Sequence, residues 1–274
     1  MQWEQLTLTI KTIKDFVESL YVDEFAITEP SEIDIEAIAF EQQAVVLEKP
    51  LNGCEAMIIG AGNRATITVN STSDAPRKRF SVGHELGHWF KDRGKVGNLC
   101  SHSDMENPKG YSRNRENLAN SYASELLIPT YLLKNQLLES QLNLDLINSV
   151  KSAFNTSFMM TMRRIIASNH HMGHFVIYRK DGSRWLFSKN SSLPGCFYPE
   201  STVPSGSKIY DLIVNEIDSG PGEVDGHVWC REDWADNSTV YEHAFHYHND
   251  LFVSLVWWKD EEPIWQCISN HEGL

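Results

Sequence analysis

The chain has 274 residues, of which 41% are apolar and 22% are charged, and its formal net charge is −13. This composition is typical of a folded globular protein and excludes a disordered tail, a fibrous repeat or a small disulfide-stapled scaffold as the main content. The acidic excess also argues against nucleic-acid binding, because it would repel a phosphate backbone.

The five cysteines are odd in number and none has Cys-x-x-Cys spacing, which favours a reducing compartment over a disulfide framework. The first residues lack a basic segment followed by an apolar one. The longest apolar stretch, over residues 251–258, is far too short to cross a bilayer. We therefore expect a cytoplasmic protein with no membrane partner.

Two amphipathic helices are expected near the start of the chain. Apolar residues recur at helical spacing over residues 9–20 and again over residues 31–40, with Ser31 as the expected N-cap. Short apolar segments then predict a small sheet, with strands over residues 44–47, 56–59 and 65–69. A turn at Gly60–Asn63 makes the last two antiparallel. We also expect the strand from Ala65 to Asn70 to accept a substrate backbone as an added strand.

The next helix is expected to begin at Asp74–Pro76 and to continue to Phe90. Residues 91–114 are polar and glycine-rich, as in a long surface loop beside a functional site. Helices then follow over residues 115–127 and 130–139. Apolar spacing over residues 142–167, broken near residue 155, predicts a further helix pair that resembles a helix-turn-helix.

Beyond residue 170 the pattern changes to one rich in strands. One helix is expected over residues 208–217, and strands are expected over residues 175–178, 185–187, 227–230, 239–247 and 251–258. Six of the eight tryptophans lie after residue 180. Such residues usually fill a core, although they can also line a small-molecule pocket.

Residues 84–88 read His-Glu-Leu-Gly-His inside an expected helix. Histidines four residues apart lie on one helix face with Cβ atoms about 5–6 Å apart, so both imidazoles can bind one ion. A catalytic Zn²⁺ held in this way needs a third protein ligand and keeps a position for water. Glu85 would accept the proton of that water during attack on a peptide carbonyl.

The third ligand is expected on the helix after the polar loop. Glu116 is the leading candidate, because it lies 28 residues after His88 and in the first turn of that helix. Glu125 is the second candidate, although it lies nearly half a turn away from the Glu116 face. The alternative interpretation is a surface helix on which both histidines are merely solvated.

The two segments together resemble a known family. The run Arg77–His88, followed by Glu116–Pro129, is similar to the paired motifs of the ImmA/IrrE family of zinc metallopeptidases. That family combines R-x-R-F-[TS]-x-x-H-E-L-G-H with E-x-x-A-N-x-F-A-x-x-L-L-M-P, and this chain departs only at Tyr122 and Ile128. The resemblance implies that His84, His88 and Glu116 bind zinc and that Glu85 is the general base.

The resemblance also implies an architecture. We expect an α+β chain with a zincin-like metallopeptidase domain over residues 1–135 and a helical segment over residues 136–170. A β-rich α+β regulatory or sensor-like domain is expected over residues 171–274. The resemblance extends well over residues 25–167 and is loose beyond them.

Members of this family are described as cleaving a specific repressor of the helix-turn-helix type, which derepresses phage, mobile-element or stress genes. The acidic charge suits a basic, DNA-binding protein substrate, and it equally suits solubility. The alternative function is a non-catalytic, zinc-containing transcriptional regulator or protein-interaction module. Direct nucleic-acid binding is expected only under that alternative.

Several other residues are weaker candidates. Asn120 lies one turn after Glu116 and is placed either to support a metal ligand or to pack between helices. His102 and Tyr111, in the polar loop, could donate to an oxyanion. Three histidines near one strand could form a second metal site: His243, His246 and His248. The favoured interpretation is a half-exposed strand with polar residues.

Overall fold

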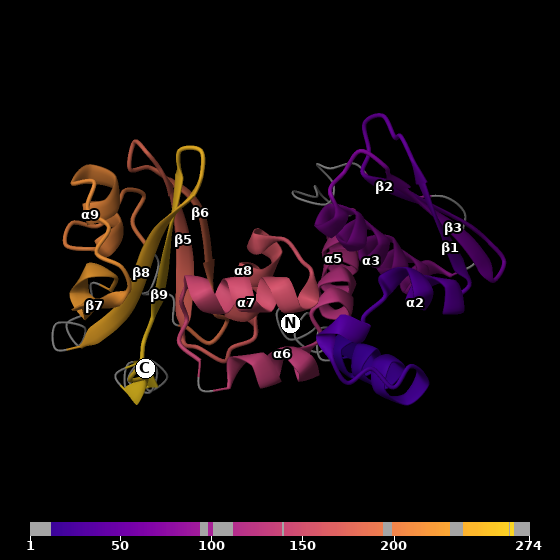
Figure 1. Ribbon diagram of the computed structural model, residues 1–274, viewed down its shortest axis with the longest axis horizontal. Helices are drawn as coiled ribbons and strands as arrows, with labels where there is room; N and C mark the ends of the chain where they lie inside the picture. Colours follow the sequence, from indigo (N-terminus) through magenta and orange to yellow (C-terminus); the bar gives the residue numbers. More distant parts are fainter. Residues whose placement is uncertain are drawn as a thin grey trace. The chain divides into compact units, whose positions relative to one another are not determined.

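The computed structural model describes residues 12–93, 98–100, 112–138, 140–193, 199–230, 238–262 and 264–265 (Figure 1). The chain divides into two compact units, and helices α7 (Leu144–Phe154) and α8 (Phe158–Ala167) contribute to both. The first unit is Met1–Gln136 with Ser149–Thr161, and the second is Leu137–Asn148 with Met162–Leu274. Helices and sheets occur together, which confirms the α+β class. The division at residues 135 and 170 stays a prediction.

The first unit opens with helical segments. A helix over residues 12–19 continues into a π-helical turn, Leu20–Glu24, and a 3-10 turn, Pro30–Glu32, precedes α2 (Ile35–Glu41). The N-cap of α2 is Asp34, whose side chain accepts the Glu36 and Ala37 backbone N–H groups. The expectation of Ser31 as the cap was wrong, because Pro30 first closes a separate turn around Ser31.

A four-stranded sheet follows in the first unit, and its order is β1-β3-β2-β4. Its strands are β1 (Ala44–Lys49), β2 (Ala56–Ala61), β3 (Arg64–Asn70) and β4 (Asn98–Cys100). The antiparallel pairing of β2 with β3 is confirmed, whereas β1 runs parallel to β3. The expectation that the strand at Ala65–Asn70 accepts a substrate was wrong, because β3 is already hydrogen-bonded to a strand on each side.

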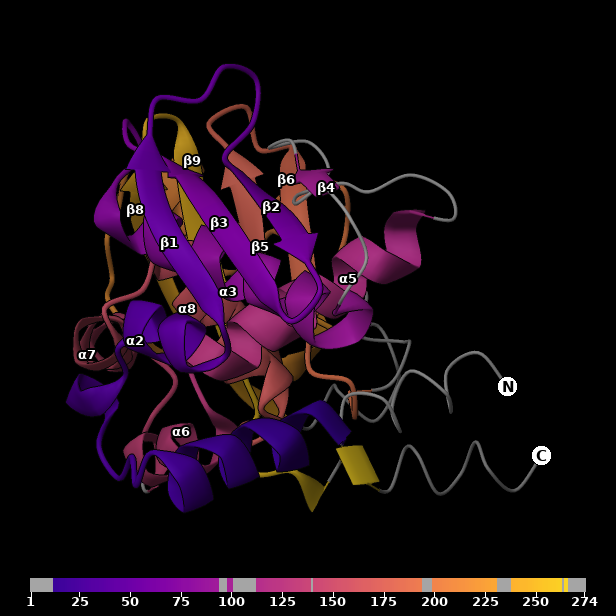
Figure 2. The ribbon, with the colours of Figure 1, turned by 90° about the vertical axis from the view of Figure 1, so that its right-hand side faces the viewer.

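Helix α3 (Ala75–Asp92) covers one face of this sheet, packing against β2 and β3 (Figure 2). The Asp74 side chain caps its start by accepting the Arg77 backbone N–H at 2.8 Å, as the sequence predicts. Helix α5 (Ser112–Leu127) packs along α3, and α6 (Thr130–Leu137) follows after Pro129. Helix α5 therefore begins earlier than expected, and β4 lies in the expected loop.

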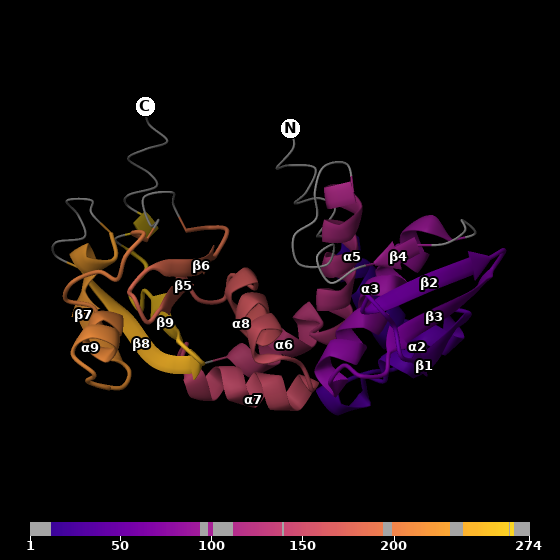
Figure 3. The same cartoon turned by 90° about the horizontal axis from the view of Figure 1, so that it is seen from above.

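The second unit is built on a five-stranded antiparallel sheet with the order β6-β5-β9-β8-β7. Its strands are β5 (Gly173–Arg179), β6 (Arg184–Lys189), β7 (Gly222–Asp225), β8 (Thr239–His248) and β9 (Leu251–Trp257). Helix α9 (Lys208–Val214) packs on β8 and β9 (Figure 3). The strand expected over residues 227–230 was wrong, because Trp229 and Cys230 donate back to the Gly226 carbonyl and close a tight turn.

One face of this second sheet buries polar side chains among apolar ones. Glu242 of β8 is fully buried and accepts four hydrogen bonds, from the Lys208 and Ile209 backbone N–H groups, the Trp229 indole and the Ser254 hydroxyl. These bonds tie the start of α9 to the sheet. Burial raises the pKa of Glu242, and the four donors oppose that rise.

His174 of β5 is the contrasting case. It is fully buried, and neither ring nitrogen has a hydrogen-bond partner among the residues that the structure describes. Its ring packs edge-on against Phe187 and Trp229, with Trp258 tilted beside it. Burial, reinforced by the charge of Lys189, lowers its pKa to about 3. The imidazole is therefore neutral at physiological pH.

No helix within the described part of the chain combines the length and apolar character needed to span a bilayer. The longest helix there, α3, carries the histidine motif and several charged residues.

Candidate metal centre

The site is built by two helices that pack unusually closely. The pairs Gly83 with Ala123 and Gly87 with Ala119 show that α3 and α5 run antiparallel. A Cβ atom added at Gly87 would lie 2.9 Å from the Ala119 Cα, so only glycine fits there. This approach brings one face of α5 against the histidine face of α3.

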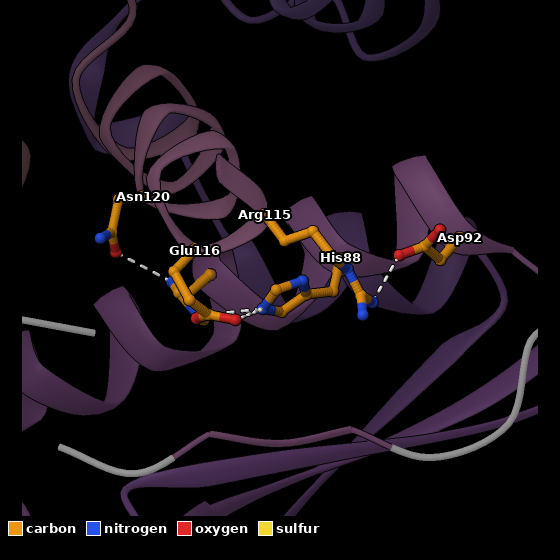
Figure 4. Close-up of polar contacts among 6 residues, drawn as sticks. His88, Asp92, Arg115, Glu116 and Asn120 are labelled. Carbon is orange, nitrogen blue, oxygen red and sulfur yellow. Dashed lines mark hydrogen bonds and ion pairs between the residues drawn. The ribbon is translucent and has the colours of Figure 1, made fainter. Parts of the chain in front are cut away.

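That packing brings the three sequence-predicted ligands together. His84 Nε2 lies 3.1 Å from Glu116 Oε2, and His88 Nε2 lies 3.5 Å from Glu116 Oε1. The two imidazole Nε2 atoms are 3.2 Å apart. All three side chains are buried, and Figure 4 shows Glu116 of α5 pointing at His88 of α3.

Asn120, one turn along α5, fixes the orientation of the first histidine. Its Oδ1 lies 2.9 Å from His84 Nδ1, and because an amide oxygen can only accept, Nδ1 donates. The Nε2 atom of His84 is thereby turned toward Glu116 and His88. The structure thus places Asn120 beside a predicted ligand.

The Glu116 carboxyl is held in its charged form. Burial raises its pKa, but hydrogen bonds with His84 and His88, together with their charge, outweigh burial and lower the pKa to about 2. A cation bound between the three groups would be attracted by the Glu116 carboxylate and would take the place of those hydrogen bonds.

The donor set fits a metal ion. The ligand atoms of His84, His88 and Glu116 all lie within 4.8 Å of one another, and among the described residues this is the group that could hold one. Two imidazole nitrogens and one carboxylate oxygen suit a borderline cation such as Zn²⁺, and they leave positions open for other ligands.

Glu85 lies between the two histidines in sequence and is fully buried. At 3.6 residues per turn, its side chain leaves α3 about 100° around the axis from His84. Glu85 therefore flanks the histidine face rather than sharing it.

Glu125, the other candidate for the third ligand, has a capping role instead. Glu125 Oε1 accepts the Thr130 backbone N–H at 2.6 Å, and Oε2 accepts the Thr130 hydroxyl at 3.1 Å. Glu125 thus caps the start of α6 and is not part of the histidine group.

The three histidines considered for a second metal site have other partners. His243 Nδ1 accepts the Leu144 backbone N–H at the start of α7, and His246 pairs with the Asn249 carbonyl. Together with His248 they form no metal-binding group within the described ranges. His102 and Tyr111 lie outside the residues that the structure describes.

Sequence reasoning missed one ion pair beside the site. Arg115 Nη2 lies 2.6 Å from Asp92 Oδ2, joining the start of α5 to the last residue of α3 (Figure 4). The signal was present in the sequence, because Asp92 is four residues after His88 and Arg115 directly precedes Glu116. Their pairing becomes visible only once the antiparallel register of the helices is known.

Comparison with known proteins places this geometry in a family. The model of the IrrE N-terminal-like domain, Peptidase_M78, matches residues 28–165, just over half of the chain and the whole of the histidine and glutamate site. The chain belongs to this family. The resemblance seen in the sequence is thereby confirmed, and the family supports a metallopeptidase type of function.

Solved structures match the chain as well, and one of them is similar over most of its length. It is described as a Mycobacterium tuberculosis transcriptional regulator, and the match covers 90% of this chain and 75% of that chain. The TM-score is 0.56 and the sequence identity is 12%, so the likeness concerns the fold. A search of curated proteins gave no match.

Proposed function

We propose that this chain is a zinc-dependent metalloendopeptidase of the cytoplasm that cleaves a specific protein. One observation carries the proposal: in a member of a peptidase family, two imidazoles and a carboxylate converge in a buried group that fits a metal ion. A purely structural zinc is usually closed by four protein ligands, whereas this group has three among the residues that the structure describes.

In this proposal His84, His88 and Glu116 hold the zinc ion. When bound, zinc polarises a peptide carbonyl and makes water more acidic. Glu85 is the general base: it takes a proton from the attacking water and passes it to the leaving nitrogen as the C–N bond breaks. Its full burial strengthens these interactions because water is largely excluded.

Asn120 is the positioning residue for His84. Its hydrogen bond to Nδ1 selects the tautomer whose Nε2 lone pair faces the metal position. Asn120→Ala removes that hydrogen bond, and we expect metal affinity to fall by about tenfold in a chelator competition.

The substrate proposed is a helix-turn-helix repressor, whose cleavage would derepress phage, mobile-element or stress genes. The support is the family and the net charge of −13, which attracts a basic, DNA-binding protein at long range.

The test compares newly formed protein N-termini in host cells that express the wild type, Glu85→Gln or Glu41→Gln. Glu41 is exposed at the end of α2, so its variant removes the same charge away from the site. We expect a few new termini, in one repressor, with the wild type and Glu41→Gln but not with Glu85→Gln. Purified Glu85→Gln should keep its metal.

Identical terminus profiles for all three proteins, under basal and stress conditions, would contradict the peptidase proposal. Tight, salt-sensitive binding of duplex DNA by the same protein would then favour the non-catalytic regulator.

A further inference from the structure

The ion pair between Asp92 and Arg115 lies directly beside the metal-binding group. Asp92 follows His88 by one helical turn on α3, and Arg115 precedes Glu116 on α5. In Figure 4, Asn120 lies on one side of Glu116 and the ion pair lies on the other. The Asp92 side chain is 16% exposed and that of Arg115 is 45% exposed.

The close contacts between α3 and α5 end before they reach Glu116. The close backbone contacts run from Gly83 with Ala123 to Gly87 with Ala119. Glu116 lies nearly one turn beyond the last of these contacts, in the early part of α5. The hydrogen bond between Asn120 and His84 joins the two helices one turn after Glu116 on α5, and the ion pair joins them one residue before Glu116.

We propose that Asp92 and Arg115 are a positioning pair that clamps the start of α5 onto the end of α3 and thereby fixes Glu116 as the third metal ligand. The inference rests on the metal centre of the proposed function. It assigns neither residue a contact with substrate. A partly exposed ion pair adds little to global stability, so its effect is local.

A simple field effect predicts a different pattern. Asp92 is an anion near the site and would attract a cation, whereas Arg115 is a cation and would repel one. If the pair acts only through its field, Asp92→Asn weakens metal binding and Arg115→Gln strengthens it. If the pair positions Glu116, both substitutions weaken metal binding, and the double variant binds the metal no more weakly than either single variant.

The experiment measures zinc affinity of the full chain by competition with a chelating dye, for the wild type, both single variants and the double variant. We expect about tenfold weaker binding in all three variants, within the range for groups that orient metal ligands. Arg115→Lys, which keeps the charge, should recover part of the loss. Thermal unfolding of the metal-free proteins should stay unchanged.

The matched control is a second ion pair of α3. Lys78 Nζ lies 2.8 Å from Glu48 Oε2 of β1, close to the start of α3. Lys78→Gln breaks an ion pair of similar exposure without approaching Glu116 and should leave zinc affinity unchanged.

Opposite effects of the two single variants, additive losses in the double variant, or affinities equal to that of the wild type would each overturn the positioning role. An equal loss in Lys78→Gln would do so as well. Failure of the wild type to bind zinc is a separate result: it would overturn the metal centre itself and this inference with it.

Discussion

The two units of the chain both bury histidines and carboxylates, but they arrange them differently. In the first unit, His84, His88 and Glu116 face one another. In the second, His174 packs among aromatic rings, and Glu242 is surrounded by four donors from the chain itself. Burial of a titratable side chain therefore does not by itself indicate a metal centre.

The contrast between the carboxylates of Glu242 and Glu116 shows which feature indicates a metal centre. The donors around Glu242 satisfy its oxygens, so that it needs no ligand and ties α9 to the sheet. Glu116 instead faces two imidazole nitrogens that can themselves act as acceptors. Lone pairs that face one another in one buried space suit a bound cation, whereas a carboxylate with its own donors is structural.

The strongest test of this contrast changes one carboxylate in each unit. Glu116→Gln removes a charged ligand, and we expect zinc affinity to fall by at least roughly a hundredfold. Glu242→Gln should leave zinc affinity unchanged and lower the free energy of unfolding by about 2 kcal/mol, because an amide N–H₂ would face donors. Chelator competition and thermal unfolding measure the two effects. Loss of zinc binding in Glu242→Gln would contradict the assignment of Glu116 as a metal ligand and of Glu242 as a structural carboxylate.

A second test concerns the close packing between α3 and α5 in the first unit. Gly87→Ala forces α3 and α5 apart, because the new Cβ meets the Ala119 Cα and Tyr122 Cβ at 2.9 Å. We expect a loss of about 1–3 kcal/mol in stability together with weaker zinc binding.

Gly83→Ala is the matched control for that substitution. Its nearest neighbour, the Ala123 Cα, lies at 3.2 Å, and alanine gains up to about 1 kcal/mol in helix propensity over glycine. Equal destabilisation by both substitutions would contradict the closer approach of α3 and α5 at Gly87 than at Gly83.

The third test addresses the buried histidine of the second unit. The unfolded chain binds a proton on His174 below the ordinary pKa of 6.5, whereas the folded chain binds it only below about 3. Stability is therefore full above pH 6.5 and falls as the pH drops toward 3, by about 1.4 kcal/mol per pH unit. His174→Phe removes this dependence.

We compare the free energies of unfolding of His174→Phe and the wild type. Their difference should shift by about 2 kcal/mol in favour of the variant between pH 7.5 and pH 5. Urea unfolding followed by tryptophan fluorescence gives both values, since Trp229 and Trp258 lie beside this ring. Parallel pH profiles for the two proteins would show that His174 is not held neutral.

The sequence predicted the site better than its surroundings. The i, i+4 spacing of His84 and His88 is imposed by helix geometry, and Glu116 could be placed because it begins the next helical pattern. Both inferences need only local periodicity. The packing of α5 against α3 then brings the three side chains together.

What the sequence could not show depends on long-range pairing. The central place of β3 follows from its parallel pairing with β1, which no local pattern encodes. The link between Asp92 and Arg115 follows from the register of two helices. The apolar residues near Trp229 resemble a strand, yet a turn also delivers them to the core.

The division of the ligands between two helices has a consequence for motion. His84 and His88 come from α3 and Glu116 comes from α5, so a bound ion adds a cross-link between two helices that are already held together by packing, a hydrogen bond and an ion pair. Any excursion that lifts α5 must first release the ion, and saturation at a hundred times the dissociation constant opposes such opening by about 2.7 kcal/mol. We therefore expect amide hydrogen exchange along α5 to be slower in the metal-bound protein than in the metal-free protein.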